Sequence, residues 1–180
     1  MPKGPASSSS SLRGTRRTGV LFVCYANICR SPLAEGIFRE LARQRGLDRD
    51  FTVDSAGVAA IVGAPPHAHS VAVARRNGIT LTGKSRQLVR ADLYRFQHIL
   101  LLDRQVAALF DKLCGPSKAR ARGPVHDPRG ATRLLATVST PRARGAALDI
   151  RDPIGEPEDA FEQLYTQLDA HCLALLRALS

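Results

Sequence analysis

The sequence predicts one α/β domain in which a four-stranded parallel sheet is flanked by helices on both faces. Short apolar segments alternate with longer amphipathic segments, which is the pattern of parallel strands joined by crossover helices. The first apolar segment, residues 20–23, is uninterrupted, as expected of a strand that is buried on both faces. A length of 180 residues is sufficient for one domain with a proper core.

The segment after the first strand predicts the first helix. Ser31 is a favourable N-cap residue, and Pro32 suits the first helical position. Apolar residues then recur on one helical face: Leu33, Ile37, Phe38 and Leu41. We expect this helix to run to about Arg45, with Gly46 as its C-cap.

The other elements are expected to alternate in the same way. Strands are predicted at residues 51–53, 98–102 and 133–138, and a turn at Ser55-Ala56-Gly57 is expected to end the second strand. Helices are predicted from Gly63-Ala64-Pro65-Pro66 to Asn77-Gly78, at 91–96, at 105–113 and at 158–179. Because parallel sheets bind ligands outside the carboxyl ends of their strands, we expect the functional site just after the first strand.

Two segments differ in composition from this domain. Residues 1–17 form a Ser-rich basic tail that we expect to be disordered, which places the single folded domain at residues 18–180. Residues 115–130 are rich in Gly, Pro and basic side chains, which predicts a long surface loop. The chain lacks the apolar core of a secretory signal, and no apolar run approaches the roughly 18 residues of a membrane span. We therefore expect a cytoplasmic protein that does not bind membranes.

The formal net charge of +10 suits either nucleic acid or phosphorylated, acidic substrates. Arginines are scattered, aromatic residues are few and no nucleic-acid motif is present, so we expect no nucleic-acid partner. The four cysteines (Cys24, Cys29, Cys114 and Cys172) have the spacing of neither a disulfide framework nor a zinc site. The five histidines lack strong ligand spacing as well, so we expect no metal and no other cofactor.

The stretch from Cys24 to Ser31, which joins the first strand to the first helix, has the composition of an anion site. Backbone N–H groups converge at a helix N-terminus, where the helix dipole also favours negative charge. A cysteine in that field is expected to act as a thiolate nucleophile. The guanidinium of Arg30 is expected to return over the loop and bind two phosphate oxygens. Asn27 tolerates the left-handed backbone angles that a tight anion loop requires.

The motif Cys24-x-x-Asn27-x-Cys29-Arg30-Ser31-Pro32 resembles the phosphate loop of the low-molecular-weight protein tyrosine phosphatases, whose scaffold is shared with thioredoxin-linked arsenate reductases. The resemblance covers roughly residues 18–178 through four further segments: Val53-Asp54-Ser55-Ala56-Gly57, Ser85-Arg86-Gln87-Leu88, Leu102-Asp103 and Asp152-Pro153. It implies a four-stranded parallel sheet and hydrolysis of phosphotyrosine in proteins.

The residues and the resemblance together assign roles within the loop. Cys24 is expected to form a cysteinyl-phosphate, and Arg30 to stabilise the charge on the phosphoryl oxygens. The substrate is expected to bind to the whole loop: Tyr25, Ala26, Asn27, Ile28, Cys29, Arg30 and Ser31. Ser31 is expected to hydrogen-bond the thiolate, to cap the helix, or both. The resemblance implies that Asn27 ties the loop to Ser55, and Cys29 is placed to trap an oxidised Cys24 as a disulfide.

A leaving phenolate needs a proton, and two Asp-Pro pairs are candidates for supplying it. Asp127 lies in the Gly- and Arg-rich segment, where a turn is the simplest explanation. Asp152 lies nine positions before Phe161 in the last predicted helix, as the family's general acid does. We therefore expect Asp152 to protonate the leaving group and later to activate water.

Three positions depart from the family pattern. Ala26 replaces the usual glycine, Gly83 lies where many members have a histidine that supports the asparagine, and Ile154 lies where an aromatic residue usually lines the cleft. Tyr25 is expected to supply an aromatic wall instead. Ile28 matches the members that act on phosphotyrosine, whereas those acting on phosphoarginine typically have threonine there.

Two other functions fit part of the pattern. An arsenate reductase needs two further cysteines close together, but Cys114 and Cys172 are 58 positions apart. A non-catalytic phosphate-binding module would need a site inactivated by Ala26, Gly83 or Ile154. For a phosphatase, the implied partners are tyrosine-phosphorylated proteins and a tyrosine kinase that modifies them, and we expect a monomer.

Overall fold

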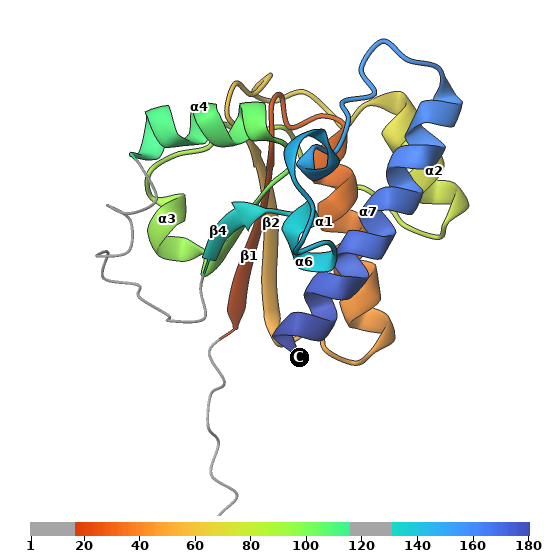
Figure 1. Ribbon diagram of the computed structural model, residues 1–180. Helices are drawn as coiled ribbons and strands as arrows, with labels where there is room; N and C mark the ends of the chain where they lie inside the picture. Colours follow the sequence, from red (N-terminus) through yellow and green to blue (C-terminus); the bar gives the residue numbers. More distant parts are fainter. Residues whose placement is uncertain (1–16, 116–130) are drawn as a thin grey trace, which may run out of the picture.

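A four-stranded sheet in the order β2-β1-β3-β4 forms the centre of the computed structural model, which describes residues 17–115 and 131–180 (Figure 1). The strands are β1 (Thr18–Cys24), β2 (Phe51–Gly57), β3 (His98–Leu101) and β4 (Ala131–Leu134), and all three pairings are parallel. The predicted sheet is thus confirmed. Because β1 is an inner strand, its last residue, Cys24, lies in the middle of the edge where the strands end.

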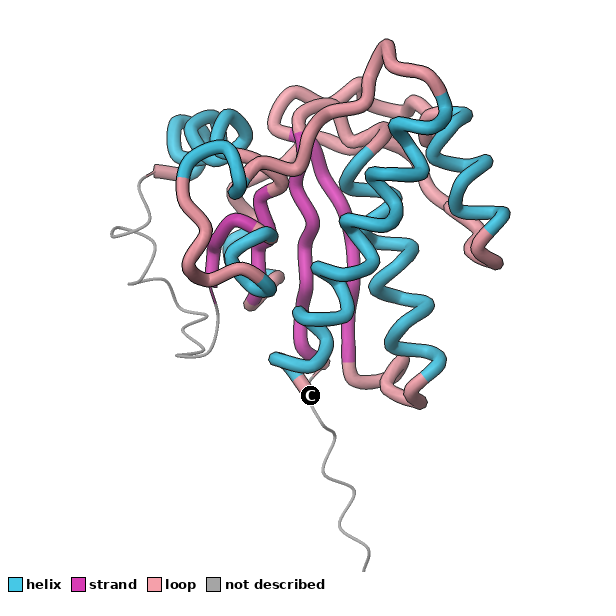
Figure 2. Tube along the Cα trace, turned by 45° about the vertical axis from the view of Figure 1, so that its right-hand side comes forward, coloured by secondary structure: helices cyan, strands magenta, loops and turns pink. Residues whose placement is uncertain are grey.

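Helices cover both faces of this sheet. They are α1 (Arg30–Gln44), α2 (Ala68–Arg76), α3 (Asp92–Arg95), α4 (Arg104–Cys114), α6 (Ala136–Ser139) and α7 (Glu158–Leu179), with a 3-10 turn η1 (Gly145–Leu148). Side chains of β1 alternate between two cores: Val20 and Phe22 pack with α1 and α7, and Leu21 and Val23 with α4. Figure 2 shows the connecting loops gathered beyond the strand ends, away from the C-terminus.

The predicted helix boundaries after the phosphate loop are close to those observed. Leu33, Ile37 and Phe38 of α1 are fully buried, and the ring of Phe38 meets that of Phe51 edge-on at 5.3 Å between centroids. Gly46, just past the end of α1, has a φ of 68°, the left-handed backbone conformation that commonly ends a helix. In the part of the chain that the structure describes, no helix is long and apolar enough to cross a membrane.

Two local predictions are wrong. The expected turn at residues 55–57 belongs to β2, whose pairing with β1 continues to Gly57 opposite Cys24. Small residues are needed here because a Cβ on Gly57 would lie 2.7 Å from the carbonyl oxygen of Tyr25. The predicted strand at 133–138 stops at Leu134 and turns into α6, so packing against α7 overrides the strand preference of its Thr and Val residues. The predictions for the tail and for residues 116–130 concern segments outside the described residues.

Candidate active site

The loop at residues 24–30 turns its carbonyl groups away from its own centre. The carbonyl oxygens of Cys24 and Tyr25 accept hydrogen bonds from the backbone of Val58 and Ala59, at 3.0 and 2.9 Å. The Ile28 carbonyl accepts from the N–H of His67 at 2.8 Å. With these carbonyls bound on the outside, the N–H groups of the loop are available to an anion on the inside.

The sulfur of Cys24 lies at the base of this loop. Its side chain is only 3% exposed, and its Sγ lies 2.9 Å from Ser31 Oγ and 3.3 Å from the backbone N–H of Asn27. Both groups stabilise a thiolate by donating a hydrogen bond to it. The structure thus places the Ser31 hydroxyl within hydrogen-bonding distance of the Cys24 sulfur, and its stabilisation of a thiolate stays a prediction.

The expectation that Ser31 caps the first helix is wrong. α1 begins at Arg30, the N-cap position is occupied by Cys29, and no side chain caps the helix there. Pro32 is consequently the third residue of the helix rather than the first. The Ser31 hydroxyl is engaged by Cys24 and Asn27 instead, because the loop brings both to within 2.9 Å of it.

Asn27 fixes the shape of the loop. Its φ is 58°, in the left-handed region predicted for it. Its Nδ2 donates to Ser31 Oγ and to Ser55 Oγ, each at 2.9 Å, so the predicted tie to Ser55 is confirmed. Its Oδ1 accepts the backbone N–H of Arg86 at 2.8 Å. This backbone contact supports Asn27 in a chain that has Gly83 instead of the family's histidine.

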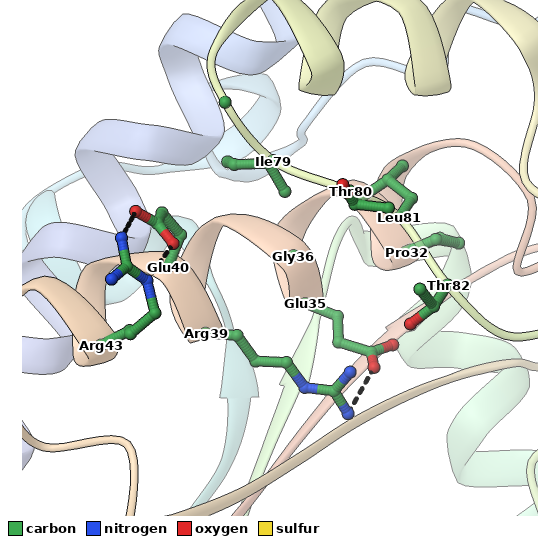
Figure 3. Close-up of a pocket in the computed structure, with 11 residues that line it drawn as sticks. Pro32, Glu35, Gly36, Arg39, Glu40, Arg43, Ile79, Thr80, Leu81 and Thr82 are labelled. Carbon is green, nitrogen blue, oxygen red and sulfur yellow. Dashed lines mark hydrogen bonds and ion pairs between the residues drawn. The ribbon is translucent and has the colours of Figure 1, made fainter.

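A largely buried carboxylate that the sequence analysis does not identify, Glu35, lies behind Ser55. Burial raises the pKa of Glu35, whereas hydrogen bonding to Ser55 and the charge of Arg39 act to lower it. Arg39 Nη2 lies 2.7 Å from Glu35 Oε1. Figure 3 shows this pair in a groove of about 160 Å³ between α1 and residues 78–82. Glu35 thus lies beside Ser55, which accepts a hydrogen bond from Asn27, and Asn27 in turn contacts Ser31 next to Cys24.

Arg30 is held between two carboxylates. Its Nη1 donates to Asp103 and, at 2.9 Å, to the carbonyl of Ile150, while its Nη2 lies 2.6 Å from Asp152 Oδ2. Burial alone would lower the pKa of Arg30, but the neighbouring Cys24, Asp152 and Asp103 outweigh burial and raise it. Arg30 therefore stays charged, and its buried Nε has no hydrogen-bond partner among the described residues.

The cavity above the loop measures about 380 Å³. Tyr25, Arg30, Asp103 and Asp152 are among its lining residues, so it brings the predicted nucleophile loop and the predicted acid together. Tyr25 is 43% exposed and forms part of the wall, as predicted, whereas Ile154 does not line the cavity. The competing acid, Asp127, lies outside the described residues.

Cys29 packs beneath the loop in a small apolar cluster with Val73 and Phe161. Burial, together with the nearby Asp152 and Cys24, raises the pKa of Cys29 to about 12. Cys29 is therefore a thiol at neutral pH. In residues 17–115 and 131–180, no group of three or more His, Cys, Asp or Glu side chains is arranged to hold a metal ion.

Because the pKa of Cys29 is about 12, iodoacetate slightly below neutral pH is expected to carboxymethylate Cys24 and to leave Cys29 unmodified. Peptide mass mapping with and without inorganic phosphate measures this, and phosphate should protect Cys24. Cys29→Ser should be labelled at the rate of the unmodified sequence. Equal labelling of Cys24 and Cys29 would contradict the prediction.

Comparison with known proteins agrees with this geometry. Residues 19–180 match the family model for low molecular weight phosphotyrosine protein phosphatases. A phosphatase of that description from Pongo abelii is 31% identical over 158 residues, which are 87% of this chain and 92% of that protein. YfkJ of Bacillus subtilis, a low molecular weight protein-tyrosine-phosphatase, is 46% identical over 86 residues, 47% of this chain and 55% of that protein.

Solved structures are similar over almost the whole chain. The crystal structure of YfkJ from Bacillus subtilis has a TM-score of 0.75 and 31% identity, over 91% of this chain and 95% of that chain. A mutant of the YwlE arginine phosphatase with a phosphorylated active-site serine has a TM-score of 0.76 and 25% identity, over 90% of this chain and 95% of that chain.

Proposed function

The chain belongs to the low molecular weight phosphotyrosine protein phosphatase family, and we propose that Cys24, Arg30 and Asp152 carry out the phosphotyrosine hydrolysis of that family. It is a hydrolase of phosphoric monoesters that uses a cysteine nucleophile. The finer assignment of roles rests on the geometry around the loop.

In the first step, Cys24 Sγ attacks phosphorus in line with the bond to the tyrosine oxygen. An S–P bond forms, the P–O bond breaks, and Asp152 transfers its proton to the departing phenolate. In the second step, Asp152 removes a proton from water, which attacks phosphorus and releases inorganic phosphate and the Cys24 thiolate. The hydroxyl of Ser31, 2.9 Å from the sulfur, stabilises the thiolate as it leaves.

The observation that carries this proposal is the arrangement of donors around Arg30. Asp103 and the Ile150 carbonyl hold Nη1, while the buried Nε has no partner among residues 17–115 and 131–180. The phosphoryl oxygens of a substrate can accept hydrogen bonds from that N–H and from the inward-facing N–H groups of the loop. Asp152 shares the Nη2 of Arg30, so an arriving phosphate competes for Arg30 and releases Asp152 toward the leaving group.

The rival functions find less support in the same residues. Cys114 and Cys172 are buried in different cores on opposite faces of the sheet, which opposes the cysteine relay of an arsenate reductase. The YwlE structure makes phosphoarginine a second candidate substrate. Against it, Ile28 packs against the cluster around Cys29 where a phosphoarginine site is expected to have threonine.

Three activities measured side by side test the assignment. They are hydrolysis of a phosphotyrosine peptide, hydrolysis of phosphoarginine and reduction of arsenate. We expect the phosphotyrosine peptide to have the largest kcat/KM and arsenate reduction to be absent. Faster turnover of phosphoarginine than of phosphotyrosine would contradict the assignment. Ile28→Thr is the matched variant, because it should shift the ratio toward phosphoarginine.

The wider setting follows from the activity. Tyrosine-phosphorylated proteins are the proposed substrates, and a tyrosine kinase is the enzyme class that supplies them. A reducing compartment such as the cytoplasm suits the proposed site, because the mechanism needs a reduced Cys24 and no disulfide joins the cysteines of residues 17–115 and 131–180.

A further inference from the structure

The general acid is carried by a short segment, residues 149–152, that follows η1 and lies against the end of β3. The N–H of Ile150 donates to the Leu102 carbonyl at 2.9 Å, and the side chain of Ile150 is fully buried. Asp152, by contrast, is 37% exposed. Among residues 17–115 and 131–180, the side chain of Asp152 forms an ion pair with Arg30 alone, for which the substrate's phosphate competes. Its Oδ1 also accepts the backbone N–H of Ile154 at 3.2 Å.

A second contact fixes this segment without involving Arg30. Arg104 Nε lies 3.1 and 3.0 Å from the two carboxylate oxygens of Asp149, and Arg104 Nη2 lies 2.7 Å from Oδ2. The backbone N–H of Arg104, at the first position of α4, also donates to Asp149 Oδ1 at 2.9 Å. Asp149 therefore receives a guanidinium fork and a helix N-terminal N–H at once.

The beginning of α4 thus contacts both Arg30 and the segment that carries Asp152. Asp103, the N-cap of α4, accepts the Val106 N–H at 2.6 Å and also binds Arg30. Arg104, the next residue, binds the segment that carries Asp152. The geometry points to Arg104 and Asp149 as positioning residues that hold Asp152 in place while Arg30 is bound to the substrate.

This inference rests on the proposed role of Asp152 as the general acid. The ion pair itself is partly exposed, with side-chain exposures of 52% for Arg104 and 28% for Asp149. Such pairs contribute little to global stability, so the main consequence of removing one is local. The hydrogen bonds from Arg104 also lower the pKa of Asp149, which keeps the carboxylate charged for this contact.

Misplacing an acid should matter most for a leaving group that needs its proton. For Arg104→Ala we expect kcat/KM to fall about tenfold with phenyl phosphate and less than about twofold with 4-nitrophenyl phosphate, whose phenolate leaves more readily. Asp149→Asn is expected to show the same selective loss. Arg144→Ala is the matched control, because Arg144 is exposed in the same part of the chain and, within the described residues, donates to the nearby Pro141 and Ala143 carbonyls alone.

A double variant separates this inference from the proposed function. If Arg104 acts through Asp152, adding Arg104→Ala to Asp152→Asn should cost no further activity with phenyl phosphate. A further tenfold fall in kcat/KM in the double variant would overturn the positioning role alone. So would an equal fall in kcat/KM with both aryl phosphates in Arg104→Ala. If Asp152→Asn itself shows no dependence on the leaving group, the acid assignment is wrong and the inference falls with it.

Discussion

Replacing Cys24 with serine is expected to abolish phosphotyrosine hydrolysis, with a fall in kcat on the order of 10⁴-fold or more, while phosphate still binds. The loss follows because a serine hydroxyl is a much weaker nucleophile than the Cys24 thiolate of the proposed mechanism, beside which Ser31 Oγ and the Asn27 N–H lie at 2.9 and 3.3 Å from the sulfur. Binding survives because the loop N–H groups and Arg30 are unchanged. Steady-state kinetics measure the first effect, and titration with phosphate or vanadate measures the second.

Two variants make this result specific. Arg30→Lys should lose turnover and anion binding together, because an ammonium cannot fork two oxygens and cannot keep both Asp103 and Asp152 in place. Cys29→Ser should keep turnover, because the Cys29 side chain packs beneath the loop against Val73 and Phe161. Substantial turnover by Cys24→Ser would rule out the covalent mechanism.

The part of the site that is continuous in sequence was predictable. The strand, the loop and the following helix lie within residues 18–44, where the apolar run, the cysteine and the arginine each carry a local signal. The left-handed backbone of Asn27 follows from its residue type, and the position of Cys24 follows from the rule that parallel sheets bind ligands at the carboxyl ends of their strands.

The supporting contacts were not predictable in this way, because they join residues far apart in the chain. Asp103 contacts Arg30 across 73 positions and Arg104 contacts Asp149 across 45, and neither aspartate has a local pattern that indicates its partner. Glu35 is different: its spacing of four from Arg39 indicates an ion pair on one helix face, but not the contact with Ser55. Contacts between residues so far apart in the sequence form only once the sheet has assembled.

The general acid gives the second large expected effect. Asp152→Asn is expected to slow the first chemical step with phosphotyrosine by roughly a hundredfold, the usual scale for losing general acid catalysis. The loss should be much smaller for an activated aryl phosphate, whose phenolate leaves without a proton.

The asparagine also removes the base that activates water in the second step. A cysteinyl-phosphate is therefore expected to accumulate with the activated substrate, so rapid-mixing measurement of the product burst is the appropriate readout. Asp127→Asn is the matched control, since Asp127 is the acid of the other Asp-Pro pair. Leaving-group dependence in Asp127→Asn and none in Asp152→Asn would reverse the assignment. The 2.6 Å contact of Asp152 with Arg30 favours the opposite result, because it places this carboxylate next to the loop that is proposed to bind the phosphate.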